Sequence, residues 1–163
     1  MNGFTIRPIK TEDNSEIAKI IRNNLERFHL DIAGTAYFDK ELDSLSFYYN
    51  AKPDKRSYFI VTDMGGTVIG GIGVAEFDGI DNCAEIQKLY LAAGAKGKGL
   101  GKKLMQTAEK FAQGAEYCRL YLETHSNLEA AIGLYERLGF HRIDKPETVL
   151  HGTMNRFYLK ELK

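Results

Sequence analysis

Hydrophobic and polar residues alternate at the start of the chain and then change to a helical spacing. Residues 4–9 alternate as a strand does, and the polar run at residues 11–14 is typical of a helix start. The apolar side of that helix carries Ile17, Ile20, Ile21 and Leu25. Residues 28–49 are aromatic-rich and less regular, and they predict a second helix over residues 39–49. Its apolar positions are Leu42, Leu45, Phe47 and Tyr49.

The middle of the chain predicts a hairpin, a third strand and a long helix. Residues 57–62 and 67–77 are rich in strand-forming side chains, and the turn 63–66 between them contains two glycines. A strand over residues 84–91 then leads through a turn of small residues into a helix over residues 99–113. That helix presents one apolar stripe: Leu100, Leu104, Ala108, Phe111 and Ala112.

The last third continues with a strand over residues 117–123. Ser126 and Asn127 then cap a helix to residue 138, which Gly139 ends in a left-handed conformation. Two short strands, 140–143 and 154–159, finish the chain. The order predicts a single α/β (α+β) domain over residues 1–163, with a mixed, mostly antiparallel sheet of about seven strands and about four flanking helices.

Composition excludes several classes of partner. Lys plus Arg equals Asp plus Glu, at 22 each, so bulk charge attracts neither nucleic acid nor a membrane surface. No stretch is apolar enough for a membrane span, and the first residues do not resemble a signal peptide, which predicts a cytoplasmic protein. Cys83 and Cys118 form no CxxC motif, so we expect two small buried residues and neither a disulfide nor a metal site.

The segment 96–101, Lys-Gly-Lys-Gly-Leu-Gly, lies where a strand passes into a helix. Glycines let a backbone approach a ligand closely, and the free N–H groups of a helix start favour a phosphate or diphosphate. Positive charge surrounds the same turn, on Lys96, Lys98, Lys102 and Lys103.

Two better-known phosphate motifs do not fit this turn. A P-loop that starts at Gly94 would need Lys after Gly99, where Leu100 stands. A dinucleotide fingerprint would need its third glycine one residue after Gly101, and it would follow the first strand of the fold. On the turn alone, a flexible surface loop with solvated lysines remains an equal alternative.

At this point the chain resembles the GCN5-related N-acetyltransferase (GNAT) superfamily. The superfamily's cofactor motif, Gln/Arg-x-x-Gly-x-Gly/Ala, falls on residues 96–101, with Lys96 in place of the usual Gln or Arg. Lys cannot bind a phosphate with two parallel N–H groups as an Arg guanidinium does. The substitution therefore concerns how tightly coenzyme A is bound and not which cofactor is bound. A second match is Leu-Tyr-Glu-Arg-Leu-Gly-Phe at residues 134–140. The resemblance implies the acyl-CoA N-acyltransferase fold and acetyl-CoA as co-substrate, with no metal.

The resemblance also implies a set of site residues. Leu89, Tyr90 and Leu91 would pair through their backbone with the pantetheine arm and stabilise the thioester oxygen. The diphosphate would lie on Lys96, Gly97, Lys98, Gly99, Leu100, Gly101 and Lys102, and Asn127 would contact the pantetheine or cap its helix. Glu85 is the candidate general base or an ordinary strand carboxylate, and Tyr135 is the candidate general acid or a packed aromatic. His125 is a further candidate, because it is the histidine nearest to the predicted site.

The acceptor is expected to be a primary amine of a small molecule or peptide, which attacks the thioester directly. Its pocket is expected from residues 28–49 and from the loop 144–153. Charge would come from Asp31, Asp39, Glu41 and Asp43, unless these form a solvated face. Apolar walls would come from Tyr37, Phe38, Phe47, Tyr48 and Tyr49. A catalytically silent acyl-CoA sensor and a phosphate-binding fold with other ligands are the rival interpretations, and monomer and homodimer are both open.

Overall fold

A seven-stranded sheet forms the centre of the computed structural model, which describes residues 3–149 and 152–162. The strands are β1 Phe4–Pro8, β2 Ser57–Asp63, β3 Val68–Phe77, β4 Cys83–Leu91, β5 Arg119–Thr124, β6 His141–Ile143 and β7 Arg156–Glu161. The helices are α1 Asn14–Arg27, α2 Leu45–Asn50, α3 Leu100–Gly114 and α4 Glu129–Arg137. The sheet order is β1-β2-β3-β4-β5-β7-β6, and β4 with β5 is its parallel pair among antiparallel neighbours. The predicted fold class is confirmed.

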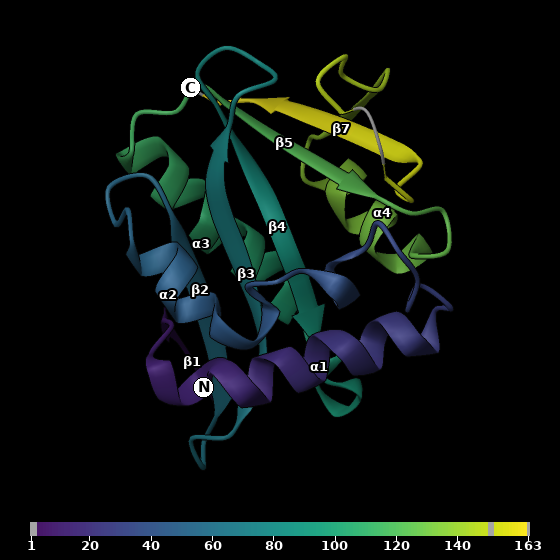
Figure 1. Cartoon of the computed structure of the whole chain (residues 1–163). Coiled ribbons are helices and arrows are strands. Elements are labelled where there is room, and N and C mark those ends of the chain that lie inside the picture. The colour runs from purple at the N-terminus through teal and green to yellow at the C-terminus, as the bar shows by residue number, and fades with distance from the viewer. Residues whose placement is uncertain (1–2, 150–151, 163) are drawn as a thin grey trace.

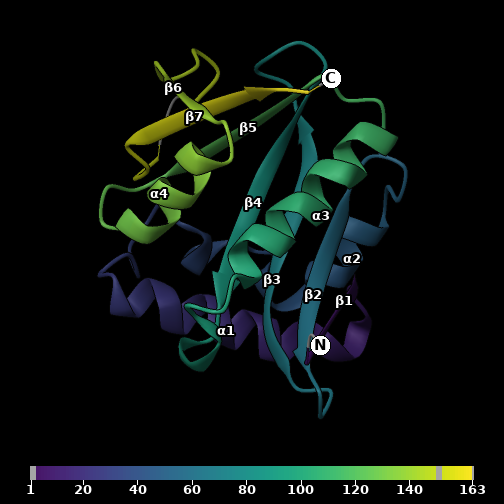
Figure 2. The same cartoon turned by 180° about the vertical axis from the view of Figure 1, so that it is seen from behind.

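The helices cover the sheet on both faces, as Figures 1 and 2 show from opposite sides. α1 and α2 lie on one face, where Ile17, Ile21 and Leu45 pack against Tyr58 and Ile60. α3 and α4 lie on the other face, over a second apolar core. Its buried members include Val74, Ala84, Leu104, Ala108, Leu120 and Leu122. The sheet therefore lies between two apolar cores, one beneath each layer of helices.

Glycines in β3 make room for two buried tyrosines on the α2 face. A Cβ atom at Gly73 would lie 2.5 Å from the hydroxyl oxygen of Tyr49, and one at Gly71 would overlap the ring of Tyr58. Both tyrosines are fully buried, and their ring centroids lie 5.2 Å apart. The glycines at these positions are thus needed for space, because any larger side chain would displace a tyrosine.

A bulge interrupts β4 at Lys88. The register against β3 shifts between Gly71 and Gly73, and Lys88 has a positive φ of 50°. The Tyr58 hydroxyl donates a hydrogen bond of 2.8 Å to the Lys88 carbonyl oxygen and so holds the bulge. Because an extra residue reverses the alternation of a strand, Leu89 packs into the core under α3, on the face opposite to Tyr90.

β4 and β5 run parallel but separate along their length. Their pairing covers only Cys83–Glu85 and Arg119–Tyr121, although β4 continues to Leu91 and β5 to Thr124. Figure 1 shows the two arrows diverging from the end of the sheet near the C-terminus, with α1 lying across their open side. The divergence leaves one edge of β4 exposed to the space between the strands.

The region between α1 and β2 differs from the predicted helix over residues 39–49. It forms 3-10 turns at Ala36–Phe38 and Leu42–Ser44, and only Leu45–Asn50 is α-helical. Asp39 is extended, with ψ of 134°, and its carboxylate pairs with Lys88 at 2.8 Å. Phe47, placed on the apolar side by the prediction, is 81% exposed because the buried face of α2 is set by Leu45 and Tyr49.

Smaller expectations were also wrong. α4 begins after Leu128, without a side-chain cap among the described residues, so Ser126 and Asn127 do not cap it. Cys83 is buried but Cys118 is exposed. The left-handed end of α4 is confirmed, with φ of 93° at Gly139.

Candidate active site

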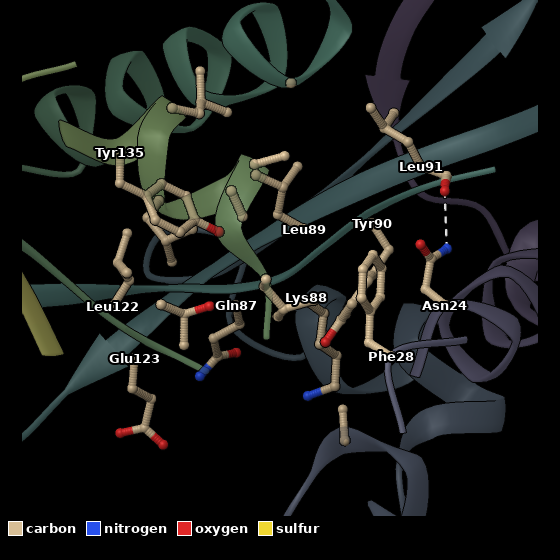
Figure 3. A pocket seen from close by; sticks show the side chains of 18 of the residues that line it. Asn24, Phe28, Gln87, Lys88, Leu89, Tyr90, Leu91, Leu122, Glu123 and Tyr135 are labelled. Carbon is tan, nitrogen blue, oxygen red and sulfur yellow. Dashed lines mark hydrogen bonds between the residues drawn. The ribbon is translucent and has the colours of Figure 1, made fainter. Parts of the chain in front are cut away.

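A cavity of about 1000 Å³ lies between the diverging ends of β4 and β5. Its walls come from the end of α1, residues 34–48, β4, the start of α3, β5 and α4. Figure 3 shows its side chains from close by. The sequence-predicted residues that line it are Glu85, Leu89, Tyr90, Leu91, Lys96, Gly97, Gly99, Gly101, Lys102, Asn127 and Tyr135. Lys98 and Leu100 do not line it: Lys98 is exposed, and the side chain of Leu100 is buried in the core under α3.

The glycine turn before α3 is open toward the cavity. Gly97 and Gly99 have φ of 78° and 76°, and a Cβ atom at either would meet nothing within 4 Å. The first intrahelical bond runs from the Lys103 N–H to the Gly99 carbonyl at 3.3 Å, so the N–H groups before it are free for an anion. The turn therefore offers free backbone N–H groups beside open space, an arrangement that can hold an anion.

The conformation of the turn gives a first prediction. Ala at Gly99 should cost about 1 to 2 kcal/mol of unfolding free energy, because an L-residue is strained at this φ. Its methyl would also enter the anion space, and we expect coenzyme A to bind about tenfold more weakly by isothermal titration calorimetry. Gly66→Ala is the matched control, since Gly66 has φ of 85° in the β2–β3 turn with equal free space. Equal affinity in both variants would contradict the assignment.

Tyr135 projects from α4 into the cavity from the α3 side of the sheet. The residue is 94% buried, and the centroid of its ring lies 6.1 Å from that of Phe140 and 6.5 Å from that of Tyr158. Figure 3 shows its hydroxyl directed into the cavity near Leu89. Burial raises the pKa of this phenol, with a smaller contribution from Tyr90, so the hydroxyl keeps its proton at neutral pH.

Glu85 faces the same space from the opposite side of the sheet. Burial raises the pKa of its carboxyl to about 7, and the hydrogen bond donated by Gln87 Nε2 at 2.9 Å opposes that rise. The neighbouring Glu123 carboxylate raises the pKa further. A carboxyl with a pKa near 7 can accept a proton at neutral pH and release it again.

Glu123 on β5 is a second carboxylate that the sequence reasoning did not single out. It lies two residues beyond Tyr121, whose register partner is Glu85, so both acids share one face of the sheet. The Tyr121 hydroxyl donates a 2.8 Å hydrogen bond to it. Glu41 lines the same part of the cavity, and among the described residues no cationic side chain pairs with Glu41, Glu85 or Glu123.

The rim beside the glycine turn is built around Phe28 at the end of α1. The ammonium of Lys96 lies 5.0 Å from the centroid of its ring, and burial lowers the pKa of that lysine. Asn127 Nδ2 donates a 3.1 Å hydrogen bond to the Phe28 carbonyl oxygen. Asn127 thus joins α1 to the loop before α4 at the cavity edge. His125 does not line the cavity, and its Nδ1 accepts the Asn127 backbone N–H at 3.0 Å.

The predicted acceptor walls are present only in part. Of the charged and aromatic acceptor residues predicted within 28–49, Asp39, Glu41 and Tyr48 line the cavity, and Phe28 and residues 34–36 line it as well. Asp31, Asp43, Tyr37, Phe38, Phe47 and Tyr49 do not line it. Asp43 is used in an ion pair with Arg22 at 2.7 Å. Of the predicted loop 144–153, residues 150–151 lie outside the described residues and the others do not line the cavity, which Met154 borders instead.

Several lining residues went unnoticed in the sequence. Asn24 is 96% buried on α1 and donates a 2.8 Å hydrogen bond to the Leu91 carbonyl, as the dashed line in Figure 3 marks. Gln87 and Lys88 line the centre of the cavity. The alternation of β4 carries a signal for Gln87, because it lies two residues from Glu85 on the same face, whereas nothing local to Asn24 indicates its partner.

Within residues 3–149 and 152–162, no group of three or more His, Cys, Asp or Glu side chains is arranged to hold a metal ion. None of the helices described is long and apolar enough to cross a membrane.

Comparison with known proteins identifies the family to which the chain belongs. The profile of the acetyltransferase (GNAT) family matches residues 21–140. An N-acetyltransferase of uncharacterized function from Escherichia coli, YjgM, is 38% identical over 141 residues, which cover 85% of this chain and 83% of that protein. This chain belongs to the GNAT family. The expected acetyl-CoA-dependent N-acetyltransferase is thereby confirmed at the level of the family.

Solved GNAT structures agree with the fold. An acetyltransferase of the GNAT family from Staphylococcus aureus superposes with a TM-score of 0.86 at 21% identity, over 98% of this chain and 99% of that one. The PaiA N-acetyltransferase of Thermoplasma acidophilum, solved in complex with coenzyme A, has a TM-score of 0.77 at 21% identity. It covers 99% of this chain and 100% of its own.

Proposed function

We propose that the protein transfers an acetyl group from acetyl-CoA to a primary amine of a small molecule or peptide, by direct attack while both substrates are bound. One observation carries the proposal: the cavity passes between β4 and β5, with Tyr135 on the α3 side of the sheet and Glu85 on the α2 side. An acyl donor and an amine can therefore approach from opposite faces and meet in the gap.

The residues beside α3 fit the donor. The open backbone at Gly97 and Gly99, with Lys96 and Lys102 beside it, suits the diphosphate of coenzyme A. The edge of β4 beyond its last pairing with β5 offers backbone groups to a pantetheine arm along Leu89–Leu91. When bound, acetyl-CoA supplies an activated acetyl thioester. Backbone N–H groups on this edge would stabilise the negative charge that develops on the thioester oxygen.

Glu85 and Tyr135 have complementary tasks in the transfer. Glu85 takes the proton that the amine must lose as its nitrogen bonds to the acetyl carbon. Tyr135 positions the sulfur and donates its phenolic proton as the carbon–sulfur bond breaks, so that coenzyme A leaves as the thiol. The tyrosinate then regains a proton from solvent as the products leave. No nucleophile on the protein is needed, and the raised pKa of the buried Cys83 thiol, about 12, makes that residue unsuited to such a role.

The acidic end of the cavity favours a cationic acceptor. Lys88 compensates Asp39 at 2.8 Å, which leaves Glu41, Glu85 and Glu123 to attract positive charge. The diphosphate end is basic by contrast, with Lys96 and Lys102. This separation of charge directs an ammonium to one end and the anionic donor to the other.

A panel of amines tests the proposed function. With acetyl-CoA fixed, we expect thiol release with diamines and with lysine-containing peptides, and at least tenfold lower kcat/KM with aspartate or glutamate as acceptors. Release of coenzyme A is followed with a thiol reagent. Tight binding of acetyl-CoA without release for any amine in the panel would favour a silent acyl-CoA module, and a preference for acidic acceptors would contradict the charge argument.

A further inference from the structure

A chain of hydrogen bonds leads from the buried side of α2 to Glu85. The Tyr49 hydroxyl donates to Gln87 Oε1 at 2.6 Å, and Gln87 Nε2 donates to Glu85 Oε1 at 2.9 Å. We infer that Tyr49 and Gln87 are positioning residues that hold the Glu85 carboxylate toward the gap and fix the pH at which it accepts a proton. The inference rests on the proposed role of Glu85 as base and extends it to two residues outside the reaction.

The direction of the chain follows from its first donor. An amide side chain can face a carboxylate with its oxygen or with its nitrogen. A buried hydroxyl that needs an acceptor for its proton binds the amide oxygen, and this turns the amide nitrogen toward the carboxylate. Tyr49 gives its proton to Oε1, so Nε2 of Gln87 remains for Glu85. This orientation places a donor on the ionised carboxylate and therefore stabilises its charged form.

The chain is built into the packing of the sheet. Tyr49 is fully buried, so its hydroxyl cannot exchange Gln87 for water without opening the core. Gly73 on β3 leaves the space that the hydroxyl occupies, since a Cβ atom there would lie 2.5 Å from it. Three elements, α2, β3 and β4, thus combine to present one amide N–H to Glu85.

Other charged and titratable groups act on Glu85 from the elements around it. They are Cys83 and Lys88 on β4, Tyr121 and Glu123 on β5, Tyr48 and Tyr49 on α2, and Asp39 before α2. Burial, Glu123 and Asp39 raise the pKa of Glu85, whereas Gln87 and Lys88 lower it. Of the two groups that lower the pKa, Gln87 donates a hydrogen bond to the Glu85 carboxylate. Loss of the Gln87 amide should therefore raise the pKa of Glu85 from about 7.

The test follows Glu85 directly by NMR of its side-chain carboxyl carbon in the protein without substrates. We expect Gln87→Met to raise the titration midpoint by about one pH unit, which is a tenfold change in proton affinity. Tyr49→Phe should raise it in the same direction by a smaller amount, because Gln87 keeps its amide but loses its orientation. An unchanged midpoint in Gln87→Met would overturn the inference, and an unchanged midpoint in Tyr49→Phe alone would remove Tyr49 from it.

A matched control separates positioning from stability. Tyr117 lies just before the start of β5 and is 92% buried. Its hydroxyl donates a 3.0 Å hydrogen bond to the Lys55 carbonyl oxygen. Tyr117→Phe should lower the melting temperature as Tyr49→Phe does and leave the Glu85 midpoint in place. A midpoint that moves equally in Tyr117→Phe would show a general effect of destabilisation and overturn the inference.

Kinetics give a second readout that also tests the role of Glu85. In Gln87→Met the acid limb of the kcat/KM profile should move by the same pH interval as the midpoint, with KM for acetyl-CoA unchanged. At pH 7 the ionised fraction then falls from about half to about one tenth, so the rate falls about fivefold. If the Glu85 titration midpoint moves but the acid limb of the kcat/KM profile does not, Gln87 still positions Glu85, but Glu85 is not the general base.

Discussion

Glu85→Gln is expected to lower kcat/KM by about 100-fold or more at pH 8, since a positioned base contributes about 10² to 10⁴ in rate. The wild-type rate should rise with pH through about 7, the pKa of Glu85, because only the ionised carboxylate accepts a proton. In the variant that limb should disappear and leave only the titration of the amine itself. Steady-state rates between pH 5.5 and 9 measure both effects, and a limb that persists near pH 7 would remove Glu85 as base.

The same substitution should increase stability at alkaline pH, which separates lost catalysis from a damaged fold. The carboxyl has its ordinary pKa of 4.5 in the unfolded chain and about 7 in the folded protein. The folded state therefore binds the proton more tightly, and stability falls as the pH rises from about 4.5 to 7. Glu85→Gln should melt at a higher temperature than the wild type at pH 8, with a smaller difference at pH 4. Differential scanning calorimetry at the two pH values provides the comparison.

Tyr135→Phe is expected to lower kcat about 100-fold and to change KM for acetyl-CoA less than about threefold. The substitution removes the proton donor but keeps the ring that packs against Phe140 and Tyr158. Because the pKa of Tyr135 is raised above its ordinary value, the loss should be the same across the neutral range. The acid limb assigned to Glu85 should stay where it is.

Tyr158→Phe is the control for that experiment. Its ring belongs to the same aromatic cluster, but its hydroxyl donates a 3.0 Å hydrogen bond to the Glu136 carboxylate outside the cavity. We expect kcat close to that of the wild type in this variant. A kcat for Tyr135→Phe equal to that of Tyr158→Phe would assign Tyr135 a packing role only.

Much of the fold could be predicted because its local patterns agree with its tertiary packing. The glycine turn at 96–101 and the strand and helix beside it occur where predicted, since glycine at 97 and 99 permits the positive φ that the turn adopts. The helix predicted over residues 39–49 forms only from Leu45 onward. The apolar spacing of the range suits a helix, but Asp39 is extended and pairs with Lys88, a partner 49 residues away. Such a long-range pair leaves no local signal.

The candidate site shows the same division. Glu85 and Tyr135 could be named from spacing and from resemblance, and the cavity brings both to one gap. The contribution of Tyr49 could not be predicted, because it depends on the bare backbone of Gly73 and on a hydrogen bond between α2 and β4. Glu123 was missed because its position relative to Glu85 depends on the register of two parallel strands, and this register cannot be read from the sequence.

The irregular segment before α2 has a consequence for how the protein can change over time. This stretch contains two 3-10 turns and the exposed side chain of Phe38, although Leu30 and Leu42 anchor it to the core. Substitutions at the exposed positions of this stretch should cost little folding free energy, whereas an L-residue at Gly99 strains the glycine turn. Under the proposed function, proteins of this kind can therefore change the acceptor that they use while acetyl-CoA remains the donor.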